Sequence, residues 1–425
     1  MIGWASILLD NALDTLIDYR GKSPKKSISG VPVISAKVVK CGYIHHPIEQ
    51  KISNEYYKVW MTRGFPKVGD VIMTTEGPMG EVAQLDETTV KYALGQRVVC
   101  MRGKKGILDN TFFKFLIASP KQQEILHAFS TGTTVSGISQ KSLRSIRVLL
   151  PPYSEQVRIG TLLGALDDKI ELNRQVNETL EAMARAIFKD WFVDFGPTRA
   201  KMEGRAPYLA PDIWSLFPDR LDDEGKPERW TEKPLDKIAG FLNGLALQKY
   251  PADDDGSLPV IKIAQLRSEN VDSAERTSIK IPPQYIIDNE DHLFSWSGSL
   301  MHKIWTSGKG GLNQHLFKVT PIDQQKWFVF YWISEYMPFF QAVASSKATT
   351  MGHIQRQHLS QARTVIGSQA IMVASDKLIG PLFEKKISIS QENHKLVAIR
   401  DVLLPKLMSG EIQVRDTEKI LERVL

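Results

Sequence analysis

The chain has 425 residues, with 42% hydrophobic and 24% charged residues, which is ordinary for a soluble protein of two or three domains. The N-terminus lacks a basic region and the densest apolar run, residues 327–333, is short, so we expect no signal peptide and no membrane span. The two cysteines, Cys41 and Cys100, argue against a disulfide framework and suit the cytoplasm, and the net charge of +6 permits nucleic-acid binding without demonstrating it.

The first 150 residues predict a mixed α/β domain. Short runs rich in β-formers are separated by glycine, proline and polar turns, at 31–34, 68–74, 98–101 and 146–150. Alternation of short strands with turns and helical stretches indicates a globule with its own core.

Residues 154–195 predict one long helix, within a segment that we place at 151–195. Ser154 is the expected cap after Pro151-Pro152, and Gly196-Pro197 is the expected stop. Steps of four and three residues alternate throughout, as on the contact face of a coiled coil. The positions on this seam are Ile159, Leu163, Leu166, Ile170, Asn173, Asn177, Leu180, Ala184, Ile187 and Trp191. About 40 residues at about 1.5 Å each give a rod of about 60 Å, which predicts a spacer between two domains.

Three segments follow the rod. Residues 196–229 are rich in proline and charge, and we interpret them as a linker with one short helical piece near Trp214. Residues 230–370 predict a second mixed domain. The remainder, 371–425, predicts a second spacer helix from Leu378 to about Ser409, followed by a tail.

The second half of the chain repeats the first with a drifting offset. The matched pieces occur in the same order in both halves, which indicates a tandem duplication. They include Pro32-Val33-Ile34 with Pro259-Val260-Ile261, residues 70–77 with 291–298, Gln96 with Gln314, Thr133-Thr134 with Thr349-Thr350, and residues 166–170 with 383–387.

The second helix carries the seam less regularly than the first. Phe383, Ile387, Val397, Leu404 and Met408 fall on it, Ser390, His394 and Asp401 interrupt it, and a neighbouring stripe of Leu396, Leu403 and Leu407 is an alternative. We expect the two helices to pair antiparallel, with the globules at opposite ends. Asn173 and Asn177 then either fix the register as buried polar residues or face water at a wide part of the seam.

Several motifs resemble one protein family. They are Leu150-Pro151-Pro152 with Glu155-Gln156, residues 166–170 with Asn173 and Asn177, residues 191–195, residues 293–298, Asn313-Gln314-His315, and residues 400–412. Over essentially its whole length, duplication included, the chain resembles the specificity subunit of type I restriction-modification systems. It departs from the family pattern before the second helix, where Ser368 replaces the Pro-Pro lead-in and the start is blurred.

The resemblance implies an α+β fold of two mixed α/β target-recognition domains in tandem duplication, separated by two long helices that pair as an antiparallel coiled coil. Each domain would read one half of a split site in double-stranded DNA. The helices would set the gap and dock two methyltransferase subunits, and restriction subunits would join outside. We expect no cofactor or metal on this chain; S-adenosylmethionine, ATP and Mg would belong to partner subunits in a bacterial or archaeal cytoplasm.

Four motifs suggest other functions, and each is incomplete. Leu150-Pro-Pro-Tyr153 lacks the Asn or Asp that an adenine methyltransferase needs, and Pro211-Asp212 with Glu224-Gly-Lys226 places nuclease-type acids in a polar linker. Cys41 with His45-His46 lacks a fourth metal ligand. Ser307-Gly-Lys-Gly-Gly311 lacks the nucleotide-loop spacing, so it is either a turn or a backbone approach to a DNA phosphate.

The candidate DNA contacts are basic and amide side chains on expected loops, because lysine and arginine hold phosphates while arginine, asparagine and glutamine read base edges. In the first half they are Arg20, Lys22, Lys25, Lys26, Lys37 and Arg97; in the second they are Lys249, Lys262, Lys303, Lys309, Asn313, Gln314 and His315. The pairs Thr133-Thr134 and Thr349-Thr350 are matched across the repeat, and because the two globules should read different bases, we expect these shared pairs to be structural or to hold phosphates, not to read bases. Trp296 is expected in the core. The alternative to a DNA-reading subunit is a non-catalytic coiled-coil scaffold that binds DNA weakly.

Overall fold

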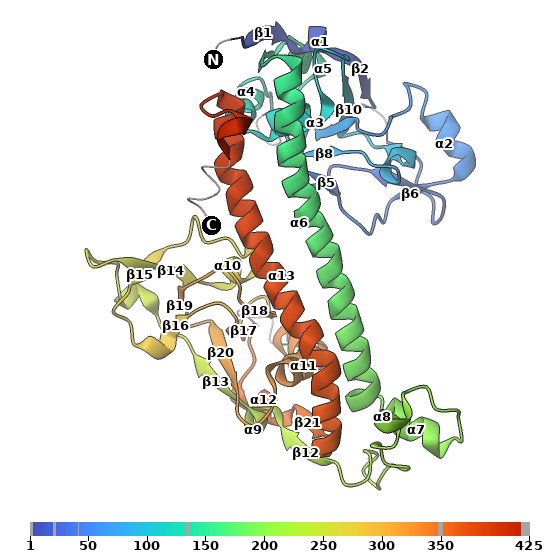
Figure 1. The fold of residues 1–425 in the computed structure, drawn as a ribbon, viewed down its shortest axis with the longest axis vertical. Helices are drawn as coiled ribbons and strands as arrows, with labels where there is room; N and C mark the ends of the chain where they lie inside the picture. Colours follow the sequence, from blue (N-terminus) through green and yellow to red (C-terminus); the bar gives the residue numbers. More distant parts are fainter. Residues whose placement is uncertain (1–2, 20–22, 41, 133–135, 347–351, 418–425) are drawn as a thin grey trace. The chain divides into compact units, whose positions relative to one another are not determined.

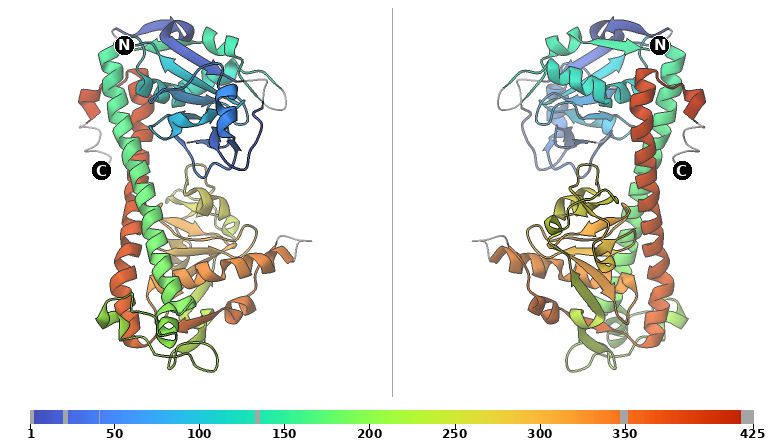
Figure 2. Two further views of the ribbon diagram at one scale, coloured as in Figure 1. Left: turned by 90° about the vertical axis from the view of Figure 1, so that its right-hand side faces the viewer. Right: turned by 90° about the vertical axis from the view of Figure 1, so that its left-hand side faces the viewer.

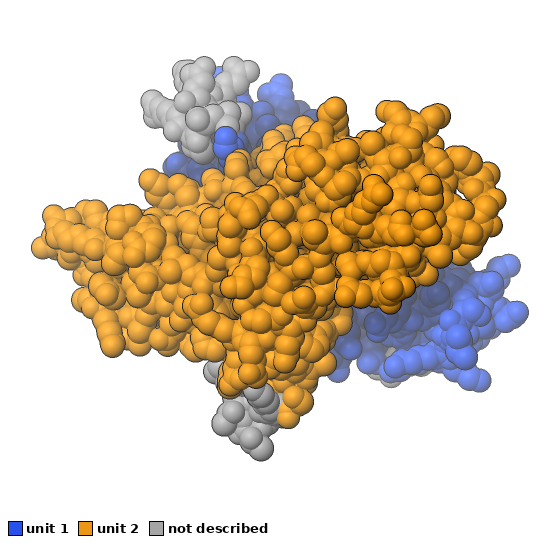
Figure 3. Space-filling view, turned by 90° about the horizontal axis from the view of Figure 1, so that it is seen from below, with its two compact units in different colours: residues 1–171, 395–425 blue, residues 172–394 orange. Residues whose placement is uncertain are grey.

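The protein is described by a computed structural model that covers residues 3–19, 23–40, 42–132, 136–346 and 352–417. The chain divides into two compact units, which are coloured separately in Figure 3. Unit 1 contains residues 1–171 and 395–425, and unit 2 contains residues 172–394. Each unit therefore holds one globule together with a part of both long helices.

The globule of unit 1 is built from small sheets (Figure 1). A four-stranded antiparallel sheet has the order β2 (Leu13–Asp18), β10 (Val98–Gly103), β7 (Val71–Thr74), β8 (Val82–Gln84). A second sheet has the order β6 (Lys51–Ile52), β3 (Val31–Ile34), β9 (Ala93–Leu94), and its β3–β9 pair is parallel. Two further pairs are β1 (Ala5–Leu8) with β11 (Arg147–Leu150) and β4 (Val39–Lys40) with β5 (Tyr43–Ile44).

Unit 2 repeats this arrangement. Its four-stranded antiparallel sheet has the order β13 (Ala239–Asn243), β20 (Leu316–Pro321), β17 (His292–Ser295), β18 (His302–Ile304). The second sheet runs β15 (Arg276–Ser278), β14 (Ser257–Ile261), β19 (Gly310–Leu312), β16 (Ile286–Ile287), and its β14–β19 pair is again parallel. The outer pair is β12 (Thr231–Pro234) with β21 (Arg363–Ile366). The predicted duplication is confirmed, since matched strands occupy the same places in both halves.

The remaining helices of the two globules follow the repeat only in part, since α2 and α10 have no α-helical counterpart in the other unit. In unit 1 they are α1 (Leu9–Ala12), α2 (Asn54–Trp60), α3 (Asn110–Ala118), α4 (Pro120–Ala128) and α5 (Gln140–Ser145). In unit 2 they are α9 (Leu235–Ile238), α10 (Ile263–Ser268), α11 (Lys326–Ser346) and α12 (Arg356–Gln361). Pro120 starts α4 and so separates it from α3, whereas Pro338 lies inside the single helix α11. Short helical turns complete the chain at Thr89–Lys91, Leu247–Lys249, Pro283–Tyr285 and Val414–Asp416.

The long helices run side by side and antiparallel within each unit (Figures 1 and 2). The first, α6 (Tyr153–Phe188), continues as a π-helical turn over Lys189–Val193. Its predicted cap at Ser154 is wrong, because the helix begins one residue earlier and the Glu155 N–H donates to the Pro152 carbonyl. Phe195 ends this segment in the left-handed region, at φ 53°.

Gly196-Pro197 was predicted only to stop the helix, but it also starts α7 (Gly196–Met202), with Pro197 in the first turn, where a missing N–H costs nothing. The linker was predicted to hold one short helix near Trp214. That helix is α8 (Pro211–Trp214), and α7 is a second helix that was not predicted.

The second long helix, α13 (Gln369–Ser409), starts nine residues before the predicted Leu378. Ser368 begins it: its carbonyl accepts from the Met372 N–H, and its hydroxyl oxygen accepts from the Ile371 N–H at 3.4 Å. Ile371 and Met372 are buried in the core of unit 2, so tertiary packing stabilises this first turn.

The core of unit 1 has two layers because successive strand residues face opposite sides. Val71 and Met73 of β7 pack with α3, the beginning of α6 and the end of α13. The intervening Ile72 belongs to a separate core with Trp60 and the second sheet. Gly160 of α6 allows close approach to α3, since a Cβ there would lie 2.9 Å from the Phe112 nitrogen.

The core of unit 2 is strongly aromatic. Phe188 and Phe192, from the end of α6 and its π turn, pack against Trp327 and Phe328 of α11. Trp191, also buried, contacts Phe217 of the linker edge to face at 5.1 Å. The motif at 191–195 therefore joins the long helix to the globule that follows it.

Two histidines pack together in unit 2, where His292 is buried and His302 is half-buried. His292 Nε2 is 3.0 Å from His302 Nδ1, and His302 Nε2 is 3.0 Å from the Ser334 hydroxyl. Burial, reinforced by the positive charges of nearby groups including Lys386, lowers the pKa of His292 well below its usual value and that of His302 to about 3. Both rings are therefore neutral at pH 7.

Among the described residues, no helix is both long enough and apolar enough to span a bilayer.

Candidate nucleic-acid interface

In unit 1, chain segments far apart in sequence meet at the ends of β7 and β10. The Thr75 N–H donates to the Arg97 carbonyl, and the Ile138 N–H donates to the Thr75 carbonyl. The Ser23 hydroxyl donates to Gln96 Oε1 at 2.7 Å, and the Arg97 guanidinium lies 3.4 Å from the Glu76 carboxylate. We call Ser23, Glu76, Gln96 and Arg97 loop cluster 1. It offers an exposed guanidinium and an amide on a framework fixed by backbone hydrogen bonds.

The other predicted contacts of unit 1 are only partly assembled around this cluster. Lys25 and Lys26 are exposed and close to Ser23 in sequence, and Lys37 is exposed in the turn before β4. Arg20, Lys22, Thr133 and Thr134 lie outside the described residues.

Unit 2 carries a second polar cluster at the equivalent place, at the ends of β13 and β17 and before β20. Trp296 Nε1 donates to Asn243 Oδ1 at 2.8 Å and to the Gln314 carbonyl at 3.1 Å. The Ser297 hydroxyl is 2.9 Å from His315 Nδ1, and Gln314 Nε2 is 3.4 Å from His315 Nε2. We call Asn243, Trp296, Ser297, Gln314 and His315 loop cluster 2.

The two clusters occupy matching positions in the repeat. Glu76 and Ser297 each form an isolated β-bridge, with Gly137 and His353 respectively. Gln96-Arg97 precedes β10 as Gln314-His315 precedes β20. The two clusters lie at the same position in the repeated domain, but their side chains differ. Loop cluster 1 contains an Arg–Glu pair, whereas loop cluster 2 contains an indole, an imidazole and two amides. Such a difference is expected of two surfaces that read different base sequences.

The remaining predicted contacts of unit 2 are scattered. Asn313 is buried, Lys262 pairs with Glu275, and Lys303 lies 3.5 Å from the Glu269 carboxylate. Lys249 and Lys309 are exposed, and Thr349 and Thr350 lie outside the described residues. Trp296 was expected in the core. It is partly buried and packs against the core, and its indole N–H donates a hydrogen bond to Asn243 of loop cluster 2.

The glycine-rich loop 307–311 is tied to unit 2's part of α13. Thr306 Oγ1 lies 2.9 Å from His394 Nε2, and the Ser307 hydroxyl donates to the Glu269 carbonyl. Burial lowers the pKa of His394, so the imidazole is neutral at pH 7 and suited to these hydroxyl contacts. Neither a nucleotide nor a phosphate contact is needed to account for this loop.

The helix-pair residues lie on the faces that the seam predicted. In unit 1, Ile159 and Leu163 share a core with Ile399, Leu403 and Leu407, so the neighbouring stripe continues the seam of α13. The other seam residues are buried (Ala184, Trp191, Phe383, Ile387 and Met408) or half-buried (Leu166, Ile170, Leu180, Ile187, Val397 and Leu404).

Unit 2 contains a polar layer between the helices. Buried Asn173 donates through Nδ2 to Glu392 Oε2 at 3.1 Å and to Asn393 Oδ1 at 2.9 Å. Asn177 Nδ2 donates to the Ser390 hydroxyl at 3.0 Å, while Asn177 Oδ1 is buried without a partner among the described residues. Asn173 therefore does not face water, and its paired hydrogen bonds favour one register over its neighbours.

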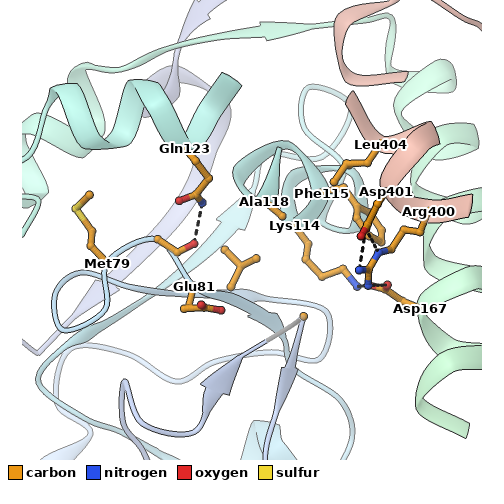
Figure 4. A pocket seen from close by; sticks show the side chains of 13 residues that line it. Met79, Glu81, Lys114, Phe115, Ala118, Gln123, Asp167, Arg400, Asp401 and Leu404 are labelled. Carbon is orange, nitrogen blue, oxygen red and sulfur yellow. Dashed lines mark hydrogen bonds and ion pairs between the residues drawn. The ribbon is translucent and has the colours of Figure 1, made fainter. Parts of the chain in front are cut away.

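A buried ion cluster in unit 1 was not predicted. Figure 4 shows Lys114 of α3, Asp167 of α6 and Arg400 of α13 converging beside a cavity of about 300 Å³. Asp167 accepts from Lys114 Nζ at 2.8 Å and from Arg400 Nη1 at 3.0 Å. Burial opposes the charge of Arg400, but Asp401 and Asp167 together outweigh it and raise its pKa. The cluster fastens the globule to both helices of its unit.

A model of the type I restriction modification DNA specificity domain matches residues 21–182 and 227–363, which together exceed half of the chain. The chain belongs to this specificity family. The family's domain is therefore present twice, and each matched segment contains one complete loop cluster.

Curated relatives from two organisms agree with this assignment. The type I restriction enzyme MjaIX specificity subunit of Methanocaldococcus jannaschii is 26% identical over 87% of this chain and 83% of its own length. The HindI specificity subunit of Haemophilus influenzae is 26% identical over 81% of this chain and 87% of its own length. The crystal structure of an S subunit from M. genitalium shares the fold, with a TM-score of 0.57 and 14% identity over 96% of both chains.

The motifs that suggested other functions in this specificity-family chain have structural roles. Leu150 is buried at the end of β11, Asp212 lies in α8, and Glu224 pairs with Lys226 in a turn. His45 and His46 are exposed, and Cys41 lies outside the described residues. Among the residues that the structure describes, no group of three or more His, Cys, Asp or Glu side chains could hold a metal ion.

Proposed function

We propose that this chain is the non-catalytic DNA-reading subunit of a type I restriction-modification complex. Residues 1–150 and 230–370 are the two target-recognition domains, and each reads one half of a bipartite, gapped site in double-stranded DNA. Residues 151–195 and 371–425 form the spacer, and 196–229 form the linker. The observation that carries the proposal is a duplicated globule whose matched loop clusters differ in chemistry.

The partners follow from this division of labour. Two methyltransferase subunits dock on the helices and methylate adenine N6 in the half-sites, and restriction subunits join the same complex. S-adenosylmethionine, ATP and Mg are bound by those partners, in a bacterial or archaeal cytoplasm. Both loop clusters support a reading role, because fixed amides and a guanidinium suit base edges in the major groove.

The test is a genome-wide map of N6-methyladenine in a methylation-free host that carries the partner methyltransferase, with and without this chain. A split, gapped motif methylated only when this chain is present is the expected result. Methylation that is absent or identical in both hosts contradicts the proposal and favours a scaffold that binds DNA weakly.

Two variants separate the parts of the proposal. Exchange of residues 230–367 for those of a relative should change one half-site only, and a change in both would refute the division of labour. Insertion of one heptad at Asn173, with a matching heptad beside its partner Asn393, should lengthen the gap and leave both half-sites as they were. An unchanged gap would exclude the helices as a ruler.

A further inference from the structure

The contacts of loop cluster 2 indicate which ring nitrogen of His315 accepts a hydrogen bond and which one donates. An amide nitrogen donates hydrogen bonds and does not accept them. Gln314 Nε2 therefore donates to His315 Nε2, which must be the unprotonated ring nitrogen. His315 Nδ1 then carries the hydrogen and donates to the Ser297 hydroxyl oxygen at 2.9 Å. Ser297 is buried, so the series of contacts from Gln314 through His315 ends at a side chain inside the protein.

The same network orients two amides in opposite senses. Trp296 Nε1 can only donate, so it holds Asn243 by its oxygen Oδ1. Asn243 is exposed and is left with its Nδ2 group for an external ligand. Gln314 is held by its nitrogen Nε2, so its oxygen Oε1, which makes no hydrogen bond among the described residues, remains available to accept one.

We propose that loop cluster 2 is the base-reading element of the second recognition domain, with Asn243 and Gln314 as the readers and Trp296 and His315 as positioning residues. The inference rests on the proposed function and deepens it. Asn243 presents a donor and selects an acceptor edge, as on guanine or thymine. Gln314 presents an acceptor and selects an exocyclic amino group, as on adenine or cytosine.

A free asparagine or glutamine can rotate its amide and read adenine through a donor and an acceptor together. The contacts with Trp296 and His315 remove that freedom before DNA arrives, and a pre-oriented reader discriminates better than one that adapts. Loop cluster 1 has an Arg97–Glu76 contact at the matching place, so it reads its half-site with different groups.

The experiment uses the full-length chain with its methyltransferase partner and maps N6-methyladenine by the same genomic assay. Asn243→Asp keeps an oxygen for the Trp296 N–H but replaces the outward donor by an acceptor. Trp296→Phe keeps an aromatic ring against the core but frees the Asn243 amide to rotate. Gln284→Glu, on the exposed turn Pro283–Tyr285, adds the same charge elsewhere in unit 2 and is the matched control.

Asn243→Asp should change the preferred base at one position of one half-site, with about a tenfold or greater loss of methylation at the original sequence. Trp296→Phe should relax that same position, and the other half-site should stay as in the wild type for every variant. A merely structural role would lower methylation at all sites equally and leave the motif unchanged.

The proposal is overturned if the wild type yields a gapped motif and both variants retain its full sequence, or if both half-sites change together. Absence of a gapped motif in the wild type would instead contradict the proposed function itself, so the two failures are distinguishable.

Discussion

Replacement of Asp167 by asparagine tests how the globule of unit 1 is fastened to its helices. The Lys114 and Asp167 side chains are 6% and 3% exposed and lie 2.8 Å apart. Removal of the carboxylate charge leaves the buried Lys114 ammonium without its counter-ion. Breaking a buried pair in this way costs about 3 to 5 kcal/mol, and we expect about 3 because Arg400 keeps its contact with Asp401.

The assay is native-state hydrogen exchange, because a loss of about 3 kcal/mol accelerates exchange through opening of unit 1 by roughly 100-fold. The effect should appear in α3 and β7 and be absent from α11 of unit 2. Asp168→Asn, an exposed neighbour, is the matched control. Equal exchange in the two variants would refute the reasoning.

A second variant separates a lost charge from a lost shape. Lys114→Met combined with Asp167→Leu removes both buried charges together, so it should recover most of the stability that Asp167→Asn loses. A double variant as unstable as Asp167→Asn would show that the hydrogen-bond geometry, and not the uncompensated charge, is what matters.

Acidification should destabilise unit 2, because His292 and His302 are neutral in the fold while the unfolded chain binds their protons below about pH 6.5. Urea unfolding at pH 5 should show a loss of about 2 kcal/mol per histidine relative to pH 7.5, and His302→Asn should lose less. Asn177→Leu should raise the unfolding free energy by about 1 kcal/mol, measured by hydrogen exchange in residues 385–394, because removal of a buried oxygen without a partner outweighs loss of the hydrogen bond from Asn177 Nδ2 to Ser390. Gly160→Ala should lower the melting temperature through its contact with the α3 backbone, whereas Gly164→Ala should gain up to about 1 kcal/mol of helix propensity.

The overall arrangement of domains and long helices could be predicted from the sequence, because the tandem duplication and the contact face of the coiled coil both leave repeating patterns. The seam placed Ile159 and Leu163 on the face that the structure buries, and the repeat matched residues 70–74 to 291–295, which form central strands in both units. The predicted ends of the helices were wrong where tertiary packing determines them. The start of α13 near Ser368 was not predicted, because its first turn depends on burial of Ile371 and Met372 in a core that sequence spacing does not reveal.

Residue type predicted some members of the two loop clusters, but the sequence only partly predicted which residues lie together in them. Arg97, Gln314 and His315 were identified because basic and amide groups read bases, and they lie in the two clusters. Asn243 and Trp296 were not predicted as partners, although Asn243 ends β13 and Trp296 follows β17. Lys262 and Lys303 were also chosen by residue type; they pair with Glu275 and Glu269, and their contact with DNA stays a prediction.

The structure indicates how two globules with the same backbone arrangement can present different side chains to a ligand. Backbone contacts at the matched positions, such as Thr75 to Arg97 in unit 1 and Trp296 to His315 in unit 2, are formed by peptide groups and do not depend on side-chain identity. The side chains at these places can therefore change with little effect on the core behind them. Asp167 and Asn173 lie instead in contacts with several specific partners, where a single replacement disturbs the attachment of a globule or the register of the helices. Under the proposed function, recognition and architecture are therefore carried by separate residues of one repeated domain.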